Sequence, residues 1–334
     1  MYNSVLFIGD LSGKWTRSHA RLDAIRRQLP NGTVKAVNWN KSGFFGRFLL
    51  KVYFKLNLRI LAPFYFIPTS GLKNIELVWI DNFPLFPPGI LPIFKKFFKN
   101  ATVILVSEDN FLLAHNHANL HRSALPYYDR IFTTKRYVME KFTGNKAVSR
   151  IYDSFDDRLP DEKATKDSVH EYDVSFIGTF EQNRFEYLKH LSEHGIKVDI
   201  FGNGWPRQEK YPNLRFHPAV YGPDYRTIAL RSRINLLFLR HQNFDDVTSR
   251  SFEIPAFGVF FLAEKSIAHE QLYDNQDILF SDHTELLRKV RYWLAADAPA
   301  RFSLASRLSS IIATPQNSIS TQVKQILTTS GKSQ

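Results

Sequence analysis

The sequence predicts an α/β protein with parallel β-sheets, and two observations support this fold class. Short apolar runs typical of β-strands alternate with helical segments along most of the 334 residues. Several of these runs break at glycine, as Tyr172–Ile177 does at Gly178, and charged residues follow others. In parallel sheets the loops at the carboxyl ends of the strands bind the ligand, so we expect the functional site there.

Chain length and composition indicate two globular domains. A chain of 334 residues that is 44% hydrophobic and 23% charged suits two folded domains of ordinary size. We expect a first domain over 1–155, a second over 172–312 and a C-terminal helix or tail over 313–334, with the polar stretch 153–171 as linker. The expected strands are 5–9, 34–39, 75–80, 101–106 and 130–134 in the first domain, and 172–177, 196–201, 234–239 and 259–262 in the second.

The net charge of +12 favours an anionic partner, which would be a polyanion, a phosphorylated ligand or an anionic membrane surface. No window reaches 18 uncharged apolar residues, so a membrane span is not expected. The sequence contains no cysteine, which excludes a disulfide scaffold and thiolate metal sites and agrees with a cytoplasmic location.

Residues 43–62 combine a basic repeat with an unusually apolar background. Arg47, Lys51, Lys55 and Arg59 recur every four positions, a spacing that fits one face of a helix but also a strand. We favour a helix, because the segment is long for a strand. Two interpretations stay open. In the first, the helix lies on an anionic membrane or on a hydrophobic acceptor; in the second, it packs on the sheet and exposes one basic stripe to solvent.

Two glycine-containing loops follow strands of the second domain. The loop at Gly178 and Thr179 opens a helix that carries Arg184, so its free N–H groups and this arginine would suit a phosphate. The loop Gly202-Asn203-Gly204 would let the backbone pass beside a bulky ligand. Both loops also fit ordinary turns that need no ligand.

The segment 245–253 carries the most specific candidate residues. Proline is tolerated in the first turn of a helix, so Pro255 predicts a helix that begins within 248–253. Its start would suit a diphosphate with Arg250 beside it, while Glu253 would accept hydrogen bonds from a ribose diol and Asp245 from sugar hydroxyls. In the alternative, Glu253 only complements the helix dipole and Thr248 caps the helix.

The order and spacing of several motifs resemble a known family. Segments 173–179, 201–205, 248–258 and 285–292 resemble the nucleotide-binding domain of GT-B glycosyltransferases, specifically the CgeB-like, spore-maturation type. Segment 127–135 is similar to the end of that family's first domain. The resemblance implies two Rossmann-like domains facing across a cleft. It also implies sugar transfer from a nucleotide-sugar donor, with no essential metal and no further cofactor.

The resemblance also implies roles for individual residues. Retaining relatives use two glutamates eight residues apart; Glu253 matches the second, toward the ribose, but Asp245 replaces the first. The shorter side chain of Asp245 leaves its contact with the donor sugar, and the retention of configuration, open. The loop from Gly9 to Gly13 would face the donor phosphates. Asp109 would bind or deprotonate the acceptor hydroxyl, or would only form an Asx turn.

One set of histidines suggests a metal site. His115, His117 and His121 lie close together in the sequence, but they lack carboxylates at ligand spacing. The acidic pairs at 156–157 and 245–246 do not follow the sheet arrangement that a metal-dependent transferase needs. We therefore expect no metal.

These observations together predict a cytoplasmic glycosyltransferase, with the inner face of a membrane as the alternative location. It would pass a sugar to a glycan or lipid-linked acceptor, and Arg184, Arg240 and Arg250 would share the charge of the departing diphosphate. Two other classes stay open: a non-catalytic basic α/β protein that binds anions or membranes, and a nucleotide-sugar epimerase on the same fold. Nucleic acid is not expected, because basic runs interleaved with exposed aromatic residues are lacking.

Overall fold

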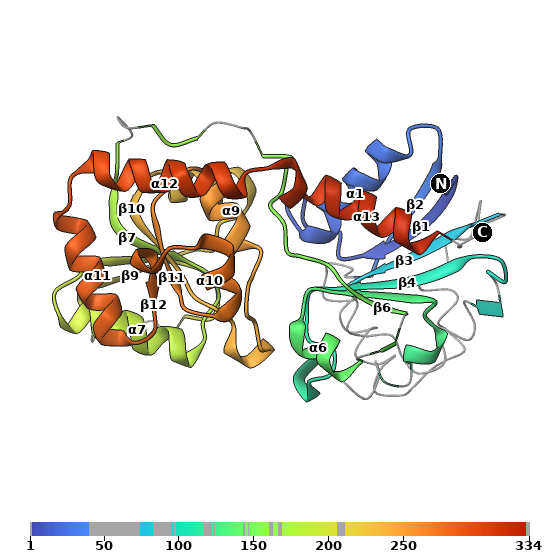
Figure 1. Cartoon of the computed structure of the whole chain (residues 1–334), viewed down its shortest axis with the longest axis horizontal. Coiled ribbons are helices and arrows are strands. Elements are labelled where there is room, and N and C mark those ends of the chain that lie inside the picture. The colour runs from blue at the N-terminus through green and yellow to red at the C-terminus, as the bar shows by residue number, and fades with distance from the viewer. Residues whose placement is uncertain are drawn as a thin grey trace. The chain divides into compact units, whose positions relative to one another are not determined.

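The computed structural model describes most of the chain as two compact units, one of Met1–Tyr152 with Ile319–Gln334 and one of Asp153–Ser318 (Figure 1). The predicted basic helix at 43–62 lies outside the described residues. The described residues are 2–39, 74–82, 95–96, 98–116, 122, 124–142, 144–145, 147–159, 163–165, 169–205 and 211–331.

The first unit contains a six-stranded parallel sheet with strand order β2-β1-β3-β4-β5-β6. Five of these strands coincide with predicted ones to within a few residues, and β6 is an addition. The elements are β1 (Ser4–Gly9), α1 (Arg17–Gln28), β2 (Thr33–Asn38), β3 (Leu77–Asp81), β4 (Thr102–Ser107), η2 (Ala114–Asn116), η3 (Leu125–Tyr127), β5 (Arg130–Thr133), α6 (Arg136–Lys141), β6 (Val148–Arg150) and α13 (Ile319–Ser330).

Alternate side chains of these strands build a core on each face of the sheet. Val5 and Phe7 of β1 join one buried cluster, whereas Leu6 and Ile8 join the other. Strands β3 and β4 divide their side chains between the same two clusters with the same period of two. Because both faces are covered, the strands read in the sequence as continuous apolar runs.

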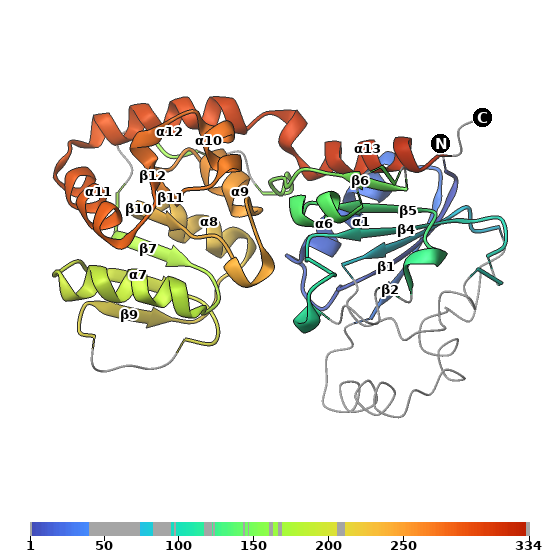
Figure 2. The ribbon, with the colours of Figure 1, turned by 60° about the horizontal axis from the view of Figure 1, so that its bottom comes forward.

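The C-terminal helix α13 belongs to the first unit. It lies alongside α1 in both ribbon views (Figures 1 and 2), and Ile319, Val323 and Ile326 are completely buried there. The sequence analysis separated 313–334 as a helix or tail. The spacing of these apolar residues gives α13 one apolar face, and the first unit covers that face.

The second unit contains another six-stranded parallel sheet, with strand order β12-β11-β10-β7-β8-β9. Strands β9 and β12 are additions to the predicted ones. The elements are β7 (Tyr172–Ile177), α7 (Gln182–Glu193), β8 (Val198–Phe201), β9 (Leu214–His217), α8 (Gly222–Leu230), β10 (Ser232–Leu237), η4 (His241–Asn243), α9 (Arg250–Ala256), β11 (Phe261–Glu264), α10 (Ile267–Tyr273), η5 (Gln276–Ile278), β12 (Leu279–Phe280), α11 (His283–Ala295), α12 (Ala298–Ile312) and η6 (Pro315–Asn317).

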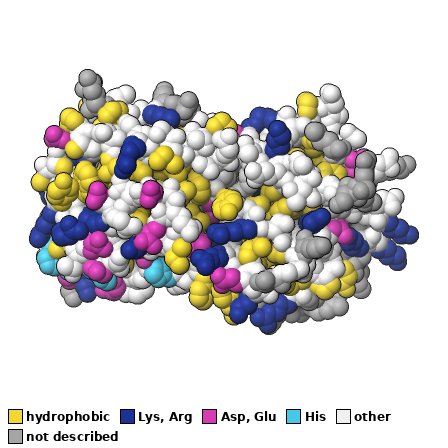
Figure 3. Space-filling model, in the orientation of Figure 1, with side chains coloured by type: hydrophobic (Ala, Val, Ile, Leu, Met, Phe, Trp, Pro, Cys, Tyr) yellow, Lys and Arg dark blue, Asp and Glu magenta, His cyan; other side chains and the backbone are white. Residues whose placement is uncertain are grey.

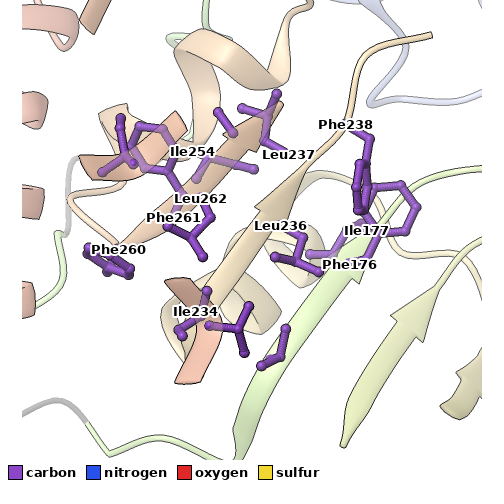
Figure 4. Close-up of a cluster of buried hydrophobic side chains, with 14 of the residues drawn as sticks. Phe176, Ile177, Ile234, Leu236, Leu237, Phe238, Ile254, Phe260, Phe261 and Leu262 are labelled. Carbon is purple, nitrogen blue, oxygen red and sulfur yellow. The ribbon is translucent and has the colours of Figure 1, made fainter. Parts of the chain in front are cut away.

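Helices cover both faces of the second sheet. Helices α7 and α11 pack together on one face, and α9 packs with α12 on the other (Figure 1). Buried side chains of the central strands, including Phe176, Leu236 and Phe261, fill the core between these layers (Figure 4). Two parallel sheets covered by helices confirm the predicted α/β class.

The predicted linker is packed against the second unit over part of its length. Phe155, Leu159 and Ala164 contact the core of that unit, and the Ala164 amide donates to the Phe257 carbonyl at 3.0 Å. The sequence analysis predicts 153–171 as a polar linker. The compact second unit instead begins at Asp153.

Charged side chains of both signs are mixed on the face of the molecule shown in Figure 3. Lysine and arginine side chains there are interspersed with acidic and hydrophobic ones and form no single basic patch. On this face, the basic side chains therefore do not by themselves mark a binding surface.

Candidate functional site

The candidate site lies at the carboxyl edge of the second sheet, where its parallel strands end. The loops after β7, β8, β10 and β11 meet at this edge because neighbouring strands run in the same direction. The charged residues Glu181, Arg184, Arg240, Asp245, Arg250 and Glu253 follow β7 and β10, and we call this set the edge site.

Close contacts leave little room for a Cβ atom at two glycines of this edge. A Cβ atom on Gly202 would lie 1.9 Å from the carbonyl oxygen of Gly178, and one on Gly178 would lie 2.6 Å from the Phe176 ring. The Trp205 indole donates to the same Gly178 carbonyl at 2.8 Å. The close approach of the loops after β7 and β8 thus explains Gly202, and packing against the Phe176 ring explains Gly178, both without a ligand.

Other predicted residues of these two loops also bind each other. The Phe180 amide donates to the Asn203 carbonyl at 3.0 Å, and the Asn203 side chain donates to the Tyr221 hydroxyl at 3.2 Å. Gly204 has a φ of +79°, a conformation that favours glycine. Thr179 is exposed, and its carbonyl accepts from Arg184.

The guanidinium of Arg184 joins the ends of two strands. It donates to the Leu239 carbonyl at 3.2 and 3.1 Å and to the Thr179 carbonyl at 3.1 Å. Arg184 is 6% exposed, and burial lowers its pKa while the nearby Glu181 carboxylate raises it. Because its donors point at backbone carbonyls, Arg184 holds the edge together and adds buried positive charge.

Glu181 connects this buried arginine to a more exposed one. Its Oε1 accepts from Arg240 Nε at 3.2 Å, and its Oε2 lies 3.6 Å from Arg184 Nε. The side chain of Arg240 is 43% exposed. Arg240 can therefore reach a ligand while it is still held at the edge by Glu181.

A second acidic residue, Glu264, ends β11 and supports the loop after β10. Its carboxylate accepts from the Leu239 amide at 2.9 Å and from His241 Nε2 at 2.5 Å. The hydrogen bond to Glu264 raises the pKa of His241, and burial opposes this rise. His241, whose side chain is 57% exposed, therefore adds a protonatable group beside the edge site.

A buried chain of hydrogen bonds fixes the start of α9. The Thr248 amide donates to Ser251 Oγ at 3.0 Å, and this hydroxyl lies 2.8 Å from His269 Nε2. The His269 Nδ1 donates to the Glu264 carbonyl at 2.6 Å, so the neutral ring accepts from Ser251 through Nε2. Burial lowers the pKa of His269 and keeps the ring neutral.

Pro255 lies late in α9, contrary to the prediction that it would occupy the first turn. The helix begins at Arg250, inside the predicted interval, and ends at Ala256, with Ser249 as a cap that uses no side-chain hydrogen bond. A proline at 255 cannot donate to the Ser251 carbonyl. The Tyr273 hydroxyl of α10 donates to that carbonyl instead, at 2.9 Å.

Arg250 and Glu253 lie beside the same buried tyrosine. The Arg250 Cζ atom is 5.8 Å from the centre of the Tyr225 ring. Burial and the Glu253 carboxylate raise the pKa of Tyr225 well above its ordinary range, and Arg250 opposes them. The charge of Arg250 also lowers the pKa of Arg184, so these predicted residues share one neighbourhood.

More than one buried atom in this neighbourhood lacks a hydrogen-bond partner among the described residues, and the Tyr225 hydroxyl is one of them. The Nε of Arg250 is buried and has no hydrogen-bond partner among the described residues. Asp245 accepts from the Asn243 side chain at 2.9 Å, and its charge raises the pKa of Arg184. The edge site thus combines cations, carboxylates and one unsatisfied arginine donor.

The first unit has its own polar loops at the carboxyl edge of its sheet. The loop from Gly9 to Gly13 is closed by Thr16, whose hydroxyl donates to the Asp10 carbonyl at 2.7 Å and caps α1. A Cβ atom on Gly9 would lie 2.6 Å from the Phe7 ring, whereas one on Gly13 would meet only ordinary contacts. Local packing therefore explains Gly9 but leaves Gly13 open to another role.

Asp109 lies at the end of β4 and is oriented by its neighbour Asn82. The Asn82 side chain donates to Asp109 Oδ2 at 3.0 Å, and its own oxygen lies 3.3 Å from the Asp109 amide. Asp109 is partly exposed. An amide that orients a carboxylate at a strand end fits binding of a hydroxyl group.

A buried ion network lies beside Asp109. Arg21 donates to Asp81 at 3.2 Å and to Glu108, and Arg17 donates to Glu108 at 3.0 Å. Burial alone would raise the pKa of Glu108, but Arg17 and Arg21 outweigh it and lower the pKa to about 2. This network holds the ends of β3 and β4 in place.

Only one of the three histidines considered for a metal site is among the described residues. His115 is exposed in η2, and His117 and His121 lie outside the described residues. In the part of the chain that the structure describes, no group of three or more histidine or acidic side chains has a geometry that could hold a metal ion.

A protein-family model matches much of the second unit, and solved structures share the fold of the chain. Residues 184–328, less than half of the chain, match the model of the glycosyl transferase-like family. This match spans α7 to α13 and includes most of the edge site. No curated protein matches the chain in sequence.

Solved structures share the architecture of nearly the whole chain. The N-terminal domain of trehalose-6-phosphate phosphatase from Candida albicans has a TM-score of 0.63 at 10% identity, over 99% of this chain and 97% of that one. A glycosyltransferase involved in avilamycin A biosynthesis has 0.55 at 10% identity, over 98% and 96%. A protein from Listeria monocytogenes assigned as a UDP-N-acetylglucosamine 2-epimerase has 0.54 at 9%, over 98% and 95%.

The chain has the GT-B fold. At such low identity the similarity concerns the fold alone, and the family match on 184–328 adds support for glycosyl transfer in general. The CgeB-like subtype stays a prediction.

Sequence reasoning missed Glu181, His241, Glu264 and His269. Glu264 had a detectable signal, because a carboxylate ends the otherwise apolar strand Phe261–Glu264. His241 directly follows a predicted site residue, Arg240. His269 had no such signal, because its partner Ser251 is 18 residues away in the sequence.

Proposed function

We propose that the protein is a glycosyltransferase whose edge site binds the diphosphate and ribose of a nucleotide-sugar donor. The observation that carries this proposal is Arg250, whose buried Nε has no hydrogen-bond partner among the described residues. A buried donor without a partner is costly, and a phosphate oxygen would satisfy it with a charge-assisted bond. The family match on 184–328 and the GT-B fold support the same assignment.

Different residues of the edge site would bind different parts of the nucleotide-sugar donor. Arg250 and the exposed side of Arg240 would bind the diphosphate, and Arg184 would add charge from beneath the loops. Glu253 would accept hydrogen bonds from the ribose, and Asp245 from the donor sugar. His241 would supply further positive charge when it is protonated.

The proposed reaction displaces the nucleoside diphosphate from the anomeric carbon. The acceptor oxygen forms a bond to that carbon, the bond to the diphosphate oxygen breaks, and the acceptor proton passes to a base. Asp109, held by Asn82, is the residue we propose for this proton. We also propose that the acceptor is a glycan or a lipid-linked molecule and that the reaction requires no metal. Membrane contact through 43–62 is part of the same proposal. Among the described residues, no helix is long and apolar enough to cross a membrane.

Calorimetry with nucleoside diphosphates tests the donor site. We expect Arg250→Gln to weaken binding by about tenfold or more, because a charged hydrogen bond to phosphate is lost. Arg288→Gln is the matched control, since Arg288 is 68% exposed on α11 and lies outside the edge site. Equal affinity of wild type and Arg250→Gln would refute the assignment.

A turnover assay distinguishes transfer from epimerisation. A transferase releases the nucleoside diphosphate only when an acceptor hydroxyl is present, and the sugar appears on the acceptor. An epimerase converts the nucleotide sugar without any acceptor. Conversion without an acceptor would therefore replace the transferase proposal while leaving the donor site intact.

A further inference from the structure

A small cavity lies at the amino edge of the second sheet, where its strands begin. Its volume is about 30 Å³. Ser232 opens β10, Gly258 precedes β11, and His170 precedes β7, so the cavity is at the opposite end of the strands from the edge site. Thr165, Arg233 and Arg301 also belong to its polar lining. We call it the amino-edge cavity.

Arg301 is a buried arginine whose hydrogen bonds are incomplete. It is 6% exposed, and its Nη1 donates to the Trp293 carbonyl at 2.7 Å and to the Ala296 carbonyl. Guanidinium has five N–H donors, and Nη1 carries two of them. Among the described residues, no partner is found for Nε or Nη2. Three N–H bonds of an arginine that lines the cavity thus remain available.

The charged side chains that line the cavity are all basic, and their acidic neighbours lie outside the lining. Arg233 pairs with Asp173 at 2.9 Å and donates to the Leu294 carbonyl at 2.8 Å. Asp297 accepts from the Ala300 amide at the start of α12. No carboxylate is among the described residues that line the cavity. Burial and then Arg233 lower the pKa of Arg301, and the Asp297 charge raises it.

His170 experiences the same positive field. Burial lowers its pKa first, and the charges of Arg301 and Arg233 lower it further. Two arginines and this histidine line the cavity, and the carboxylates near them, Asp173 and Asp297, are not part of its lining. An anion in the cavity would accept the free hydrogen bonds of Arg301.

We propose that the amino-edge cavity binds one small oxyanion, either free phosphate or the terminal phosphate of a monoester. A volume of about 30 Å³ has room for one or two water-sized groups, so only part of a tetrahedral anion enters while the rest faces solvent. A nucleotide or a sugar ring does not fit. This site is independent of the proposed donor site, because it uses different residues at the other end of the strands.

The pKa of His170, followed by proton NMR of its ring, tests the proposal. We expect phosphate, added at constant ionic strength, to raise this pKa, because an anion beside the ring favours the charged form. His241 reports on any phosphate that binds at the edge site instead. A parallel titration with glycerol phosphate shows whether a free anion or a monoester is preferred, and binding of either supports the site.

Arg233→Gln is the informative variant. The side chain of Arg233 is 31% exposed, so its removal spares the fold, whereas Arg301 also supports the end of α11. We expect Arg233→Gln to weaken the phosphate effect on His170 by about tenfold. Arg231→Gln is the control, since Arg231 makes a similar surface pair with Glu171 at 2.9 Å but does not line the cavity.

Two outcomes would overturn the proposal. The first is a His170 pKa that does not respond to either anion in the wild type. The second is a response that persists unchanged in Arg233→Gln, or that Arg231→Gln removes equally. Circular dichroism of each variant verifies that the fold is retained.

Discussion

At the residue scale, two arginines of the edge site differ in the partners of their hydrogen-bond donors. Arg184 and Arg250 both follow strands of the second sheet, and the charge of Arg250 lowers the pKa of Arg184. Arg184 gives its hydrogen bonds to backbone carbonyls, whereas the Nε of Arg250 has no such partner among the described residues. Sequence reasoning grouped them together, and only their contacts distinguish them.

The backbone at Gly202 lies so close to the backbone at Gly178 that adding one Cβ atom should destabilise the fold. We expect Gly202→Ala to lower the free energy of unfolding by more than about 3 kcal/mol, because the new Cβ would lie 1.9 Å from the Gly178 oxygen. Gly13→Ala is the control, since its Cβ would be 3.6 Å from the nearest atom, and we expect a change within about 0.5 kcal/mol. Urea denaturation measures both, and equal stability of the two variants would contradict the explanation.

The low pKa of Glu108 predicts a pH dependence of stability in the first unit. Its pKa falls from 4.5 to about 2 on folding, so its stabilising contribution is complete above pH 4.5 and is lost as the pH falls toward 2. This difference corresponds to about 3 kcal/mol.

Acid titration of the free energy of unfolding measures this contribution. We expect Glu108→Gln to lose less stability than the wild type between about pH 5 and pH 2, because its side chain does not titrate. Glu140→Gln, at an exposed pair with Arg136, should keep the wild-type slope. A wild-type slope in Glu108→Gln would show that this carboxyl is not responsible.

At the scale of elements, α9 depends on the helix that follows it. Pro255 lies inside this seven-residue helix, and Tyr273 of α10 satisfies the carbonyl that the proline leaves free. His269 of the same helix holds the Ser251 hydroxyl. Two side chains of α10 thus fix the helix that carries Arg250 and Glu253.

Tyr273→Phe tests this dependence. We expect it to lower the free energy of unfolding by about 1 to 3 kcal/mol, because the Ser251 carbonyl would remain buried without a donor. Tyr292→Phe, at a 63% exposed position, should change stability by less than about 0.5 kcal/mol. If both variants unfold at the same urea concentration as the wild type, the hydroxyl of Tyr273 does not replace the missing proline donor.

At the scale of the whole molecule, the chain ends in the unit in which it began. Helix α13 lies beside α1, and the buried side chains of Arg21 and Gln322 join across them with a 3.0 Å hydrogen bond. The Gln322 side chain also donates to the Tyr152 carbonyl at 2.5 Å. Residues at both ends of the sequence therefore complete one core.

A shortened chain that ends at Ser318, and so lacks α13, tests the contribution of this helix to the core of the first unit. We expect its first unit to lose several kcal/mol of stability, because three fully buried side chains of α13 are removed at once. Hydrogen exchange should show faster exchange in β1 and β3 and unchanged protection in β10 and β11. A chain that ends at Gly331 is the control, and protection of β1 in both truncated chains would contradict the role of α13.

The sequence by itself determined most of the strands, the parallel α/β class and the loops that carry polar residues. These features depend on local physics, because apolar runs and glycine breaks are properties of neighbouring residues. The tertiary structure decided three further features. It placed α13 in the first unit, it brought the Tyr273 hydroxyl to the carbonyl that Pro255 leaves without a donor, and it left the Nε of Arg250 without a partner among the described residues. Each of these depends on contacts between residues far apart in the chain, which periodicity and composition do not specify.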